Sequence, residues 1–204
     1  FVGFYSLYFA AHVRLSDSVV YLKNDALSSA QTASVFSDLI ADRTETKSVD
    51  AVVHPLFVVL HQPLAQLVVI GWERLSLDTN NARKHAVAVL TAGAAALTVA
   101  LLYQMLLWTG VATWRAALFA CVQGASTMAA VWAAVPEVWV FLGLGVTAML
   151  WAVARAENGR WWEFPLAAIY ATGCFVGCAV PAVALAFIAV FRGSAPGAWV
   201  ARVF

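Results

Sequence analysis

Hydrophobic residues gather along the chain into long runs, and shorter polar segments separate them. The runs cover residues 1–13, 52–72, 85–108, 115–135, 138–153 and 164–191. A helix needs about 20 consecutive apolar residues to cross the hydrocarbon core of a bilayer, and most of the runs approach or exceed that length. The pattern therefore predicts an all-α protein, a polytopic bundle of about five to six transmembrane helices, with residues 1–13 as the end of the first.

Residues 14–51 form the one extended polar segment, and we expect them to be an extramembrane loop. The loop contains six acidic and four basic residues, which leaves it a net charge of −2. Within it, apolar side chains recur at steps of three and four at Leu27, Ala30, Ala33, Phe36 and Ile40. This spacing predicts a short amphipathic helix over residues 26–40 that lies on the membrane surface. We expect residues 1–204 to form a single membrane domain.

Prolines and capping residues indicate where several of these helices begin or bend. Pro55 fits the first turn of a helix, where its missing N–H is not needed. Pro63 and Pro181 lie inside apolar runs, so each predicts a kink. Three residues in the connection before residue 85 can form a turn or a helix cap: Asp78, Asn80 and Asn81.

Pairs of glycines in the last two runs predict close helix packing. Gly143 and Gly145 lie in one run, and Gly173 and Gly177 form a small-xxx-small pair in the next. Small residues let the backbones of two membrane helices approach each other closely. We expect these glycines to pack helices within this chain, in preference to forming a dedicated dimer face.

Composition excludes an ordinary water-soluble domain and a nucleic-acid-binding protein. Of 204 residues, 63% are hydrophobic and 11% are charged, whereas soluble domains are about half apolar and about a quarter charged. A net charge of +1 without a basic cluster does not fit phosphate binding. The cysteines all lie in apolar runs, so we interpret them as small hydrophobic residues: Cys121, Cys174 and Cys178.

The two ends of the sequence resemble cut ends. The chain begins at Phe1, already within an apolar run, and ends at Phe204 without a polar tail. We therefore expect that the gene product extends further, at least on the N-terminal side.

His54 and Glu137 are the best candidates for a site at the edge of the membrane. Ionisable groups are costly there, and each of these two stands beside a proline at the boundary of an apolar run, where a water-filled cavity can reach it. The alternative is that both simply mark the interface. His61 follows His54 by seven residues and shares its helical face, but no third ligand has matching spacing, so we predict no metal site.

Asp25 and Asp38 of the loop are the candidates for catalysis. They bracket the predicted amphipathic helix. A carboxylate held over the membrane surface can act as a general base toward an acceptor hydroxyl, or bind a divalent ion that neutralises a lipid-linked phosphate. The alternative is that both carboxylates are merely solvated.

Four short motifs in order carry a family resemblance. They are YLKNDA around Asp25, VFSDLIADRTETKS around Asp38, HPLFVVLHQPL over residues 54–64 and AVPEVWVFLGLG over residues 134–145. In this order they resemble the N-terminal half of the glycosyltransferase C superfamily. More narrowly, they resemble multi-spanning bacterial membrane proteins that share the loop aspartate, the His-Pro-Leu-Phe entry into a helix and a later Pro-Glu.

The resemblance implies a membrane enzyme that uses a polyprenyl-phosphate-linked sugar. Asp38 or Asp25 would be the catalytic acid or base in the first extracytoplasmic loop, with His54 and Glu137 lining the same cavity. The location would be the bacterial inner (cytoplasmic) membrane. If every run crosses once, however, Glu137 lies on the opposite membrane face from the loop. The family geometry therefore requires that the run over residues 52–72 does not fully cross, or that another run is re-entrant.

A non-catalytic role is the alternative hypothesis. The short length, the lack of any complete site and nine tryptophans also fit an accessory subunit of a larger membrane complex, for example an energy-converting complex. Its partners would be other membrane subunits as well as the lipid bilayer. The sequence identifies no cofactor for either hypothesis and leaves open whether the chain is an enzyme.

Overall fold

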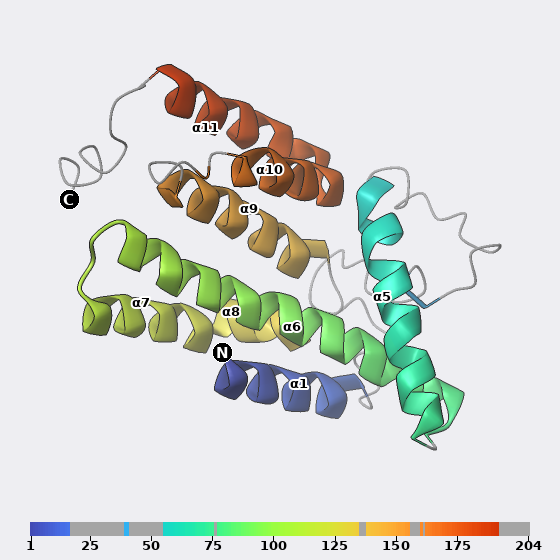
Figure 1. Cartoon of the computed structure of the whole chain (residues 1–204). Helices are drawn as coiled ribbons and strands as arrows, with labels where there is room; N and C mark the ends of the chain where they lie inside the picture. The colour runs from blue at the N-terminus through green and yellow to red at the C-terminus, as the bar shows by residue number, and fades with distance from the viewer. Residues whose placement is uncertain are drawn as a thin grey trace.

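The structure is a computed structural model, and it is all-helical in the part of the chain that it describes (Figure 1). It describes residues 1–16, 39–40, 55–75, 77–134, 138–155, 160 and 162–191. Within these ranges there are eight α-helices and one 3-10 turn, and there is no strand. They are α1 (Val2–Ser16), α5 (Pro55–Arg74), α6 (Thr79–Trp108), α7 (Thr113–Ala125), α8 (Thr127–Ala134), α9 (Val138–Arg155), α10 (Glu163–Cys174), η2 (Val176–Cys178) and α11 (Ala179–Phe191).

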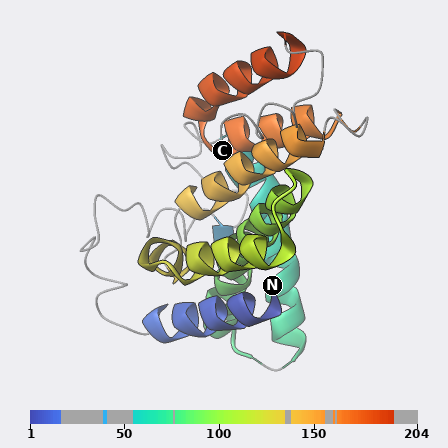
Figure 2. The same ribbon diagram turned by 90° about the vertical axis from the view of Figure 1, so that its left-hand side faces the viewer.

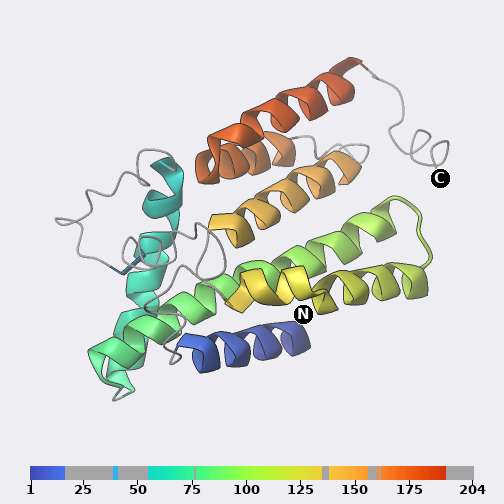
Figure 3. The same ribbon diagram turned by 180° about the vertical axis from the view of Figure 1, so that it is seen from behind.

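Helix α6 is the centre of the bundle. It contacts α1, α5, α7, α8 and α9, while α10 packs on α9 and α11 lies beyond α10. Figures 1 and 3 show these helices stacked in layers that run along a common direction, from α1 to α11. Helix α5 is the exception, because it runs across one end of the stack. Figure 2 shows the same layers from the side.

Helix α6 begins at a side-chain N-cap and buries an alanine-rich face. The Asn81 N–H donates to a side-chain oxygen of Asp78 at 3.0 Å, so Asp78 caps the helix as predicted. The helix begins at Thr79, before the predicted start at residue 85, and its buried residues are mostly alanines. Its 30 residues correspond to about 45 Å. In the described part of the chain, α6 and α9 are the two helices with the length and hydropathy to cross a membrane.

The predicted helix over residues 115–135 is broken at Ser126. The backbone of Ser126 is extended, with φ −64° and ψ 144°, and this separates α7 from α8. The hydroxyl of Ser126 accepts the Ala129 N–H at 3.2 Å and so caps the start of α8. A serine inside an apolar run can therefore end one helix and start the next, and the prediction of a single continuous helix here was wrong.

The predicted helix over residues 164–191 is also broken. Phe175 is extended, with φ −155° and ψ 116°, between α10 and η2. The break separates Gly173 from Gly177, so the expectation that this pair forms one helical packing face was wrong. Pro181 lies in the first turn of α11, where proline is tolerated, rather than at a kink.

Close packing at a glycine is confirmed between α9 and α10. A Cβ on Gly145 would lie 2.8 Å from the Cα of Ala171, whereas a Cβ on Gly143 would meet nothing within 4 Å. Because the glycine and alanine side chains are small, the α9 and α10 backbones approach each other closely at this contact.

Helix α5 begins at Pro55, as predicted, and continues through Pro63.

The bundle has apolar side chains on the outside as well as in its core. Exposed large hydrophobic residues occur on every long helix, among them Leu7, Val59, Leu64, Leu67, Ile70, Leu97, Leu118, Phe119, Val122, Leu150, Leu166, Ile169, Val180 and Val183. Among the described residues the interior is mainly hydrophobic, and it also contains four buried polar residues: His12, His61, Gln62 and Thr91. Large apolar side chains exposed on so many helices are more than a water-soluble monomer usually carries.

Candidate functional site

The four predicted site residues lie outside the described part of the chain. These are Asp25, Asp38, His54 and Glu137. Of the predicted amphipathic helix, only Leu39 and Ile40 are described. The roles assigned to these four residues therefore stay predictions, and the site is built here from their described sequence neighbours.

Those neighbours meet in one core cluster. Leu39 follows Asp38 in the sequence, Phe57 follows His54 by three positions, and Val138 follows Glu137. All three side chains are buried in the same cluster, together with Ala133 and Cys174. Residues close in sequence to three of the motifs thus belong to the same hydrophobic core cluster.

Helix α5 lies across this end of the bundle. Its main neighbours are α6 and α10, and in Figures 1 and 3 it runs across the direction of the other helices. The side-chain amide of Gln66 in α5 donates to the Ile40 carbonyl at 3.1 Å, which ties the described end of the loop to the same helix. The run over residues 52–72 therefore does not follow the direction of the other helices, although the sequence pattern predicted that it would cross like them.

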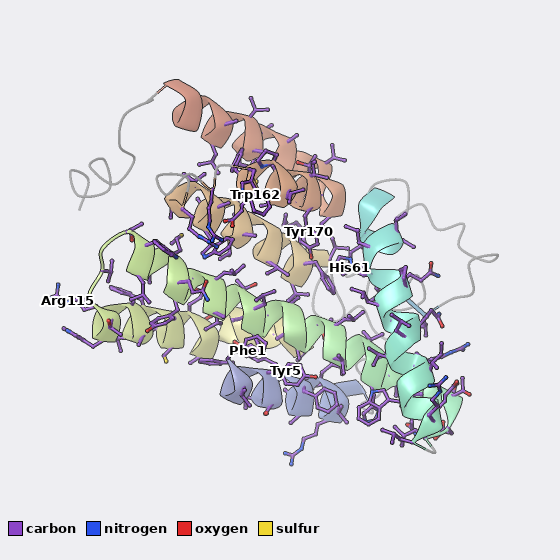
Figure 4. All side chains as sticks on the ribbon, in the orientation of Figure 1. Phe1, Tyr5, His61, Arg115, Trp162 and Tyr170 are labelled. Carbon is purple, nitrogen blue, oxygen red and sulfur yellow. The ribbon has the colours of Figure 1, made fainter. Side chains whose placement is uncertain are left out.

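His61 is a buried hydrogen-bonding centre between α5 and α10. Its Nδ1 lies 2.8 Å from the Phe57 carbonyl oxygen, and its Nε2 lies 3.0 Å from the Tyr170 hydroxyl. A carbonyl can only accept, so Nδ1 carries the proton and donates. In the neutral imidazole, Nε2 then accepts the hydroxyl proton of Tyr170. Figure 4 shows the two labelled side chains facing each other.

Aromatic rings surround this hydrogen-bonded pair. The His61 ring centroid lies 4.3 Å from that of Phe141 in α9 and 4.9 Å from that of Phe57, and the Tyr170 ring packs edge-on to it. Cys174, one turn after Tyr170, hydrogen-bonds to the Tyr170 hydroxyl. The polar atoms of the pair are therefore satisfied within an apolar setting, and together they join three helices.

Sequence reasoning treated these residues differently. It paired His61 with His54 on one helical face, and it did not single out Tyr170 at all. The signal that was available is that Tyr170 is the one tyrosine in the apolar run over residues 164–191. A buried tyrosine hydroxyl usually has a partner, which predicts an acceptor on a neighbouring helix.

A second polar group joins α1 to α6 and to the broken helix. The Tyr8 hydroxyl donates to the Gly124 carbonyl at 2.5 Å, at the end of α7. His12 Nδ1 lies 3.1 Å from the Thr91 hydroxyl, and the His12 ring also hydrogen-bonds to the backbone of Ala133 in α8. The helix α1 thus satisfies backbone groups near both ends of α8, a role that the sequence pattern did not reveal.

The opposite end of the bundle carries charge. Arg155 at the end of α9 pairs with Glu163 at the start of α10, with Nη1 and Oε2 3.3 Å apart, and both side chains are largely buried. The guanidinium lies over the rings of Trp151 and Trp108, at 4.3 Å and 5.6 Å from their centroids. The Trp151 N–H donates to the Gln104 side-chain oxygen at 3.2 Å. This Arg–Glu–Trp cluster closes the ends of α6, α9 and α10.

Nothing among the described residues gathers three or more His, Cys, Asp or Glu side chains into a possible metal site. The cysteines are free thiols, with Cys174 and Cys178 buried and Cys121 exposed on α7. Among the described residues at the α5 end, the polar contacts include the hydrogen bonds of His61 with Phe57 and Tyr170 and that of Gln66 with Ile40. Comparison with protein-family models, curated proteins and solved structures gives no match to this chain.

Proposed function

We propose that this chain is the helical core of an integral membrane protein. The observation that carries the proposal is the apolar outer surface, which spreads over all the long helices. On α5, the exposed side chains include Leu64 and Leu67, while His61 and Gln62 face inward. In a bilayer such an outer face is covered by lipid tails, and polar residues turn to the bundle interior.

The tryptophans and arginines support the same proposal. Trp108, Trp114 and Trp162 are exposed at the end of the bundle that also carries Arg115 and Arg155. Figure 4 shows Arg115 at this end. Tryptophan rings and arginine side chains gather at the membrane–water interface, where the ring or stem stays apolar and the polar part reaches water. We therefore propose that the helix direction shared by α6 and α9 crosses the bilayer, within a bacterial inner membrane.

A depth measurement tests this proposal. Cys121 is exposed on α7 and can carry a nitroxide spin label in reconstituted vesicles. We expect its relaxation to respond to dissolved oxygen and not to a water-soluble nickel complex. The matched control is a label at Asp78→Cys, which sits on the exposed N-cap of α6 and should show the opposite response. Equal access of the nickel complex to both labels would contradict the proposal.

For the activity, we propose transfer of a sugar from a polyprenyl-phosphate carrier. Support comes from the sequence resemblance and from the shared cluster of Leu39, Phe57 and Val138. The course of α5 across the bundle end adds to this support, because the family geometry needs residues 52–72 not to cross fully. In this proposal Asp38 or Asp25 exchanges a proton with the acceptor hydroxyl, while His54 and Glu137 line the cavity.

Single substitutions of the loop aspartates test the activity. We expect Asp38→Asn or Asp25→Asn to lower transfer by about 100-fold or more, the usual contribution of a general acid or base. Asp78→Asn is the matched control, since Asp78 belongs to a helix cap. Unchanged transfer in both loop variants would refute the catalytic assignment.

The accessory-subunit hypothesis makes a different prediction. It requires the exposed apolar faces to be covered by other membrane proteins, so native mass spectrometry in mild detergent should return a complex of defined stoichiometry. A chain that is released alone, with a bound polyprenyl lipid, would favour the transferase.

A further inference from the structure

We infer that His61 and Tyr170 are positioning residues that hold α5 across the end of the bundle. The inference rests on the proposed function, in which α5 follows His54 and forms part of the transferase site. Neither residue is assigned to the catalytic machinery. Their proposed role is to fix the helix that follows His54 in the sequence.

The two halves of α5 are held in different ways. The C-terminal half packs on the start of α6 through Val69, Ala82 and Ala86, with Trp72 beside them. A connection of only a few residues joins the two helices there. The N-terminal half has no such short connection to α9 or α10. Its contacts with them include the rings around Phe141 and the hydrogen bond from Tyr170.

The hydrogen bond between Tyr170 and His61 favours a single position of α5, which apolar packing alone does not do. Apolar side chains that face each other can slide by a turn at modest cost, whereas a buried nitrogen without a donor loses its hydrogen bond entirely. Because the Phe57 carbonyl already fixes the Nδ1 proton of His61, the remaining Nε2 lone pair must face a donor. Tyr170 supplies that donor from α10, so only one placement of α5 satisfies both groups.

Cys174 extends the arrangement toward the broken part of the last run. Its side chain hydrogen-bonds to Tyr170 one turn earlier, and the extended Phe175 follows directly. The position of α5 is thus linked, through Tyr170, to the C-terminal end of α10. A shift of α10 would move the Tyr170 hydroxyl and, with it, the N-terminal half of α5.

A distance measurement tests the positioning role without relying on activity. Spin labels are placed at Val59→Cys on α5 and Ile169→Cys on α10, which are 63% and 59% exposed, in full chain carrying Cys121→Ala. In the parent protein, pulsed dipolar spectroscopy should give one narrow distance distribution. We expect Tyr170→Phe, which keeps the ring and removes the hydroxyl, to broaden or shift it. Tyr103→Phe, on the far half of α6, is the matched control and should leave it unchanged.

Variants of His61 test the same hydrogen bond from its other side. His61→Leu should reproduce the effect of Tyr170→Phe, and His61→Gln should restore much of the narrow distribution, since its amide can again pair with the tyrosine hydroxyl. Interhelical hydrogen bonds in membranes shift equilibria by about 3-fold on average and by up to about 15-fold. We therefore expect kcat/KM for polyprenyl-linked sugar transfer to fall within that range in Tyr170→Phe, well below the loss expected for Asp38→Asn.

The two readouts separate the inference from the proposed function. An altered distance in Tyr170→Phe, combined with no transfer by the parent protein, would keep the α5–α10 contact and overturn the transferase proposal. An unaltered distance in both Tyr170→Phe and His61→Leu would overturn the inference, whatever the activity.

Discussion

The two ends of the bundle solve the problem of internal polarity in different ways. At the α5 end, His61 and Tyr170 form a neutral pair in which each hydrogen-bonding group of the imidazole has a partner. At the opposite end, Arg155 and Glu163 form an ion pair between tryptophan rings. The Arg155 Nε and the Glu163 Oε2 have no hydrogen-bond partner among the described groups.

The two pairs differ in what each needs in order to be buried. A neutral pair can be buried if its hydrogen bonds are complete, and it then fixes one geometry. A charged pair needs either water or a polarisable surface, and the faces of Trp108 and Trp151 supply the latter. In the two proposals above, the neutral pair fixes the position of α5, and the charged pair lies at the membrane–water interface.

Breaking the ion pair should have the largest effect. Arg155→Met leaves Glu163, whose side chain is 11% exposed, without its buried counter-charge. We expect a loss of about 3 kcal/mol in the free energy of unfolding, measured by titrating the purified protein with SDS in mixed micelles. Arg155→Met combined with Glu163→Gln should recover most of it. Arg160→Met, whose side chain is 56% exposed, should cost less than about 1 kcal/mol; an equal loss would show that burial is irrelevant here.

The close contact between α9 and α10 at Gly145 should be the next most sensitive feature. Gly145→Ala places a Cβ 2.8 Å from the Ala171 backbone, and we expect it to destabilise the bundle by about 2 kcal/mol. Gly143→Ala meets nothing within 4 Å and should be neutral or stabilising by about 0.5 kcal/mol. Opposite signs in thermal unfolding in detergent would support the assigned contact, and equal shifts would contradict it.

The aromatic part of the charged end should contribute less. Trp151→Phe removes the N–H that donates to Gln104 and weakens the face under Arg155. We expect a loss of about 1 kcal/mol, read from the same SDS titration. Trp114→Phe is the comparison, since Trp114 is exposed and its ring lies under the guanidinium of Arg115. A larger effect at Trp114 would reverse the ranking of the two arginines.

The exposed N-cap of α6 should give the smallest effect, and one that depends on pH. The hydrogen bond from the Asn81 backbone N–H lowers the pKa of Asp78 below its usual value of 3.8. The stabilisation is therefore complete above the unfolded-state pKa and is lost as pH falls through the lower folded-state pKa. Asp78→Asn should remove the loss of stability that the parent protein shows as pH falls below about 4. An unchanged acid profile of helix content by circular dichroism would contradict the assignment.

Much of the helix pattern could be predicted because apolar runs record where helices can lie. The starts at Pro55 and after Asp78 follow from local capping chemistry. The breaks at Ser126 and Phe175 could not be read from the runs, because hydropathy does not register a backbone dihedral. At the Ser126 break, the serine hydroxyl caps α8 locally, and the Tyr8 hydroxyl bonds the Gly124 carbonyl from a distant helix.

The site was less accessible to sequence reasoning than the fold. The spacing of His54 and His61 indicated a shared helical face, but the partner of His61 lies on a helix that begins about a hundred residues later. The course of α5 could not be read from the hydropathy pattern either, and the family resemblance offered it only as one of two options. An apolar run of 20 residues is compatible with crossing a bundle or lying over its end, and only long-range contacts distinguish these cases.

The contact between Tyr8 and Gly124 has a consequence for how the chain is assembled. The extended turn at Ser126 leaves the Gly124 carbonyl without the usual helical donor, in a segment otherwise suited to hydrocarbon. Its donor lies 116 positions earlier in the chain, so Tyr8 is synthesised before the carbonyl to which it donates. A circular permutation that moved α1 behind α8 would reverse this order, and the Gly124 carbonyl would then be synthesised before its donor.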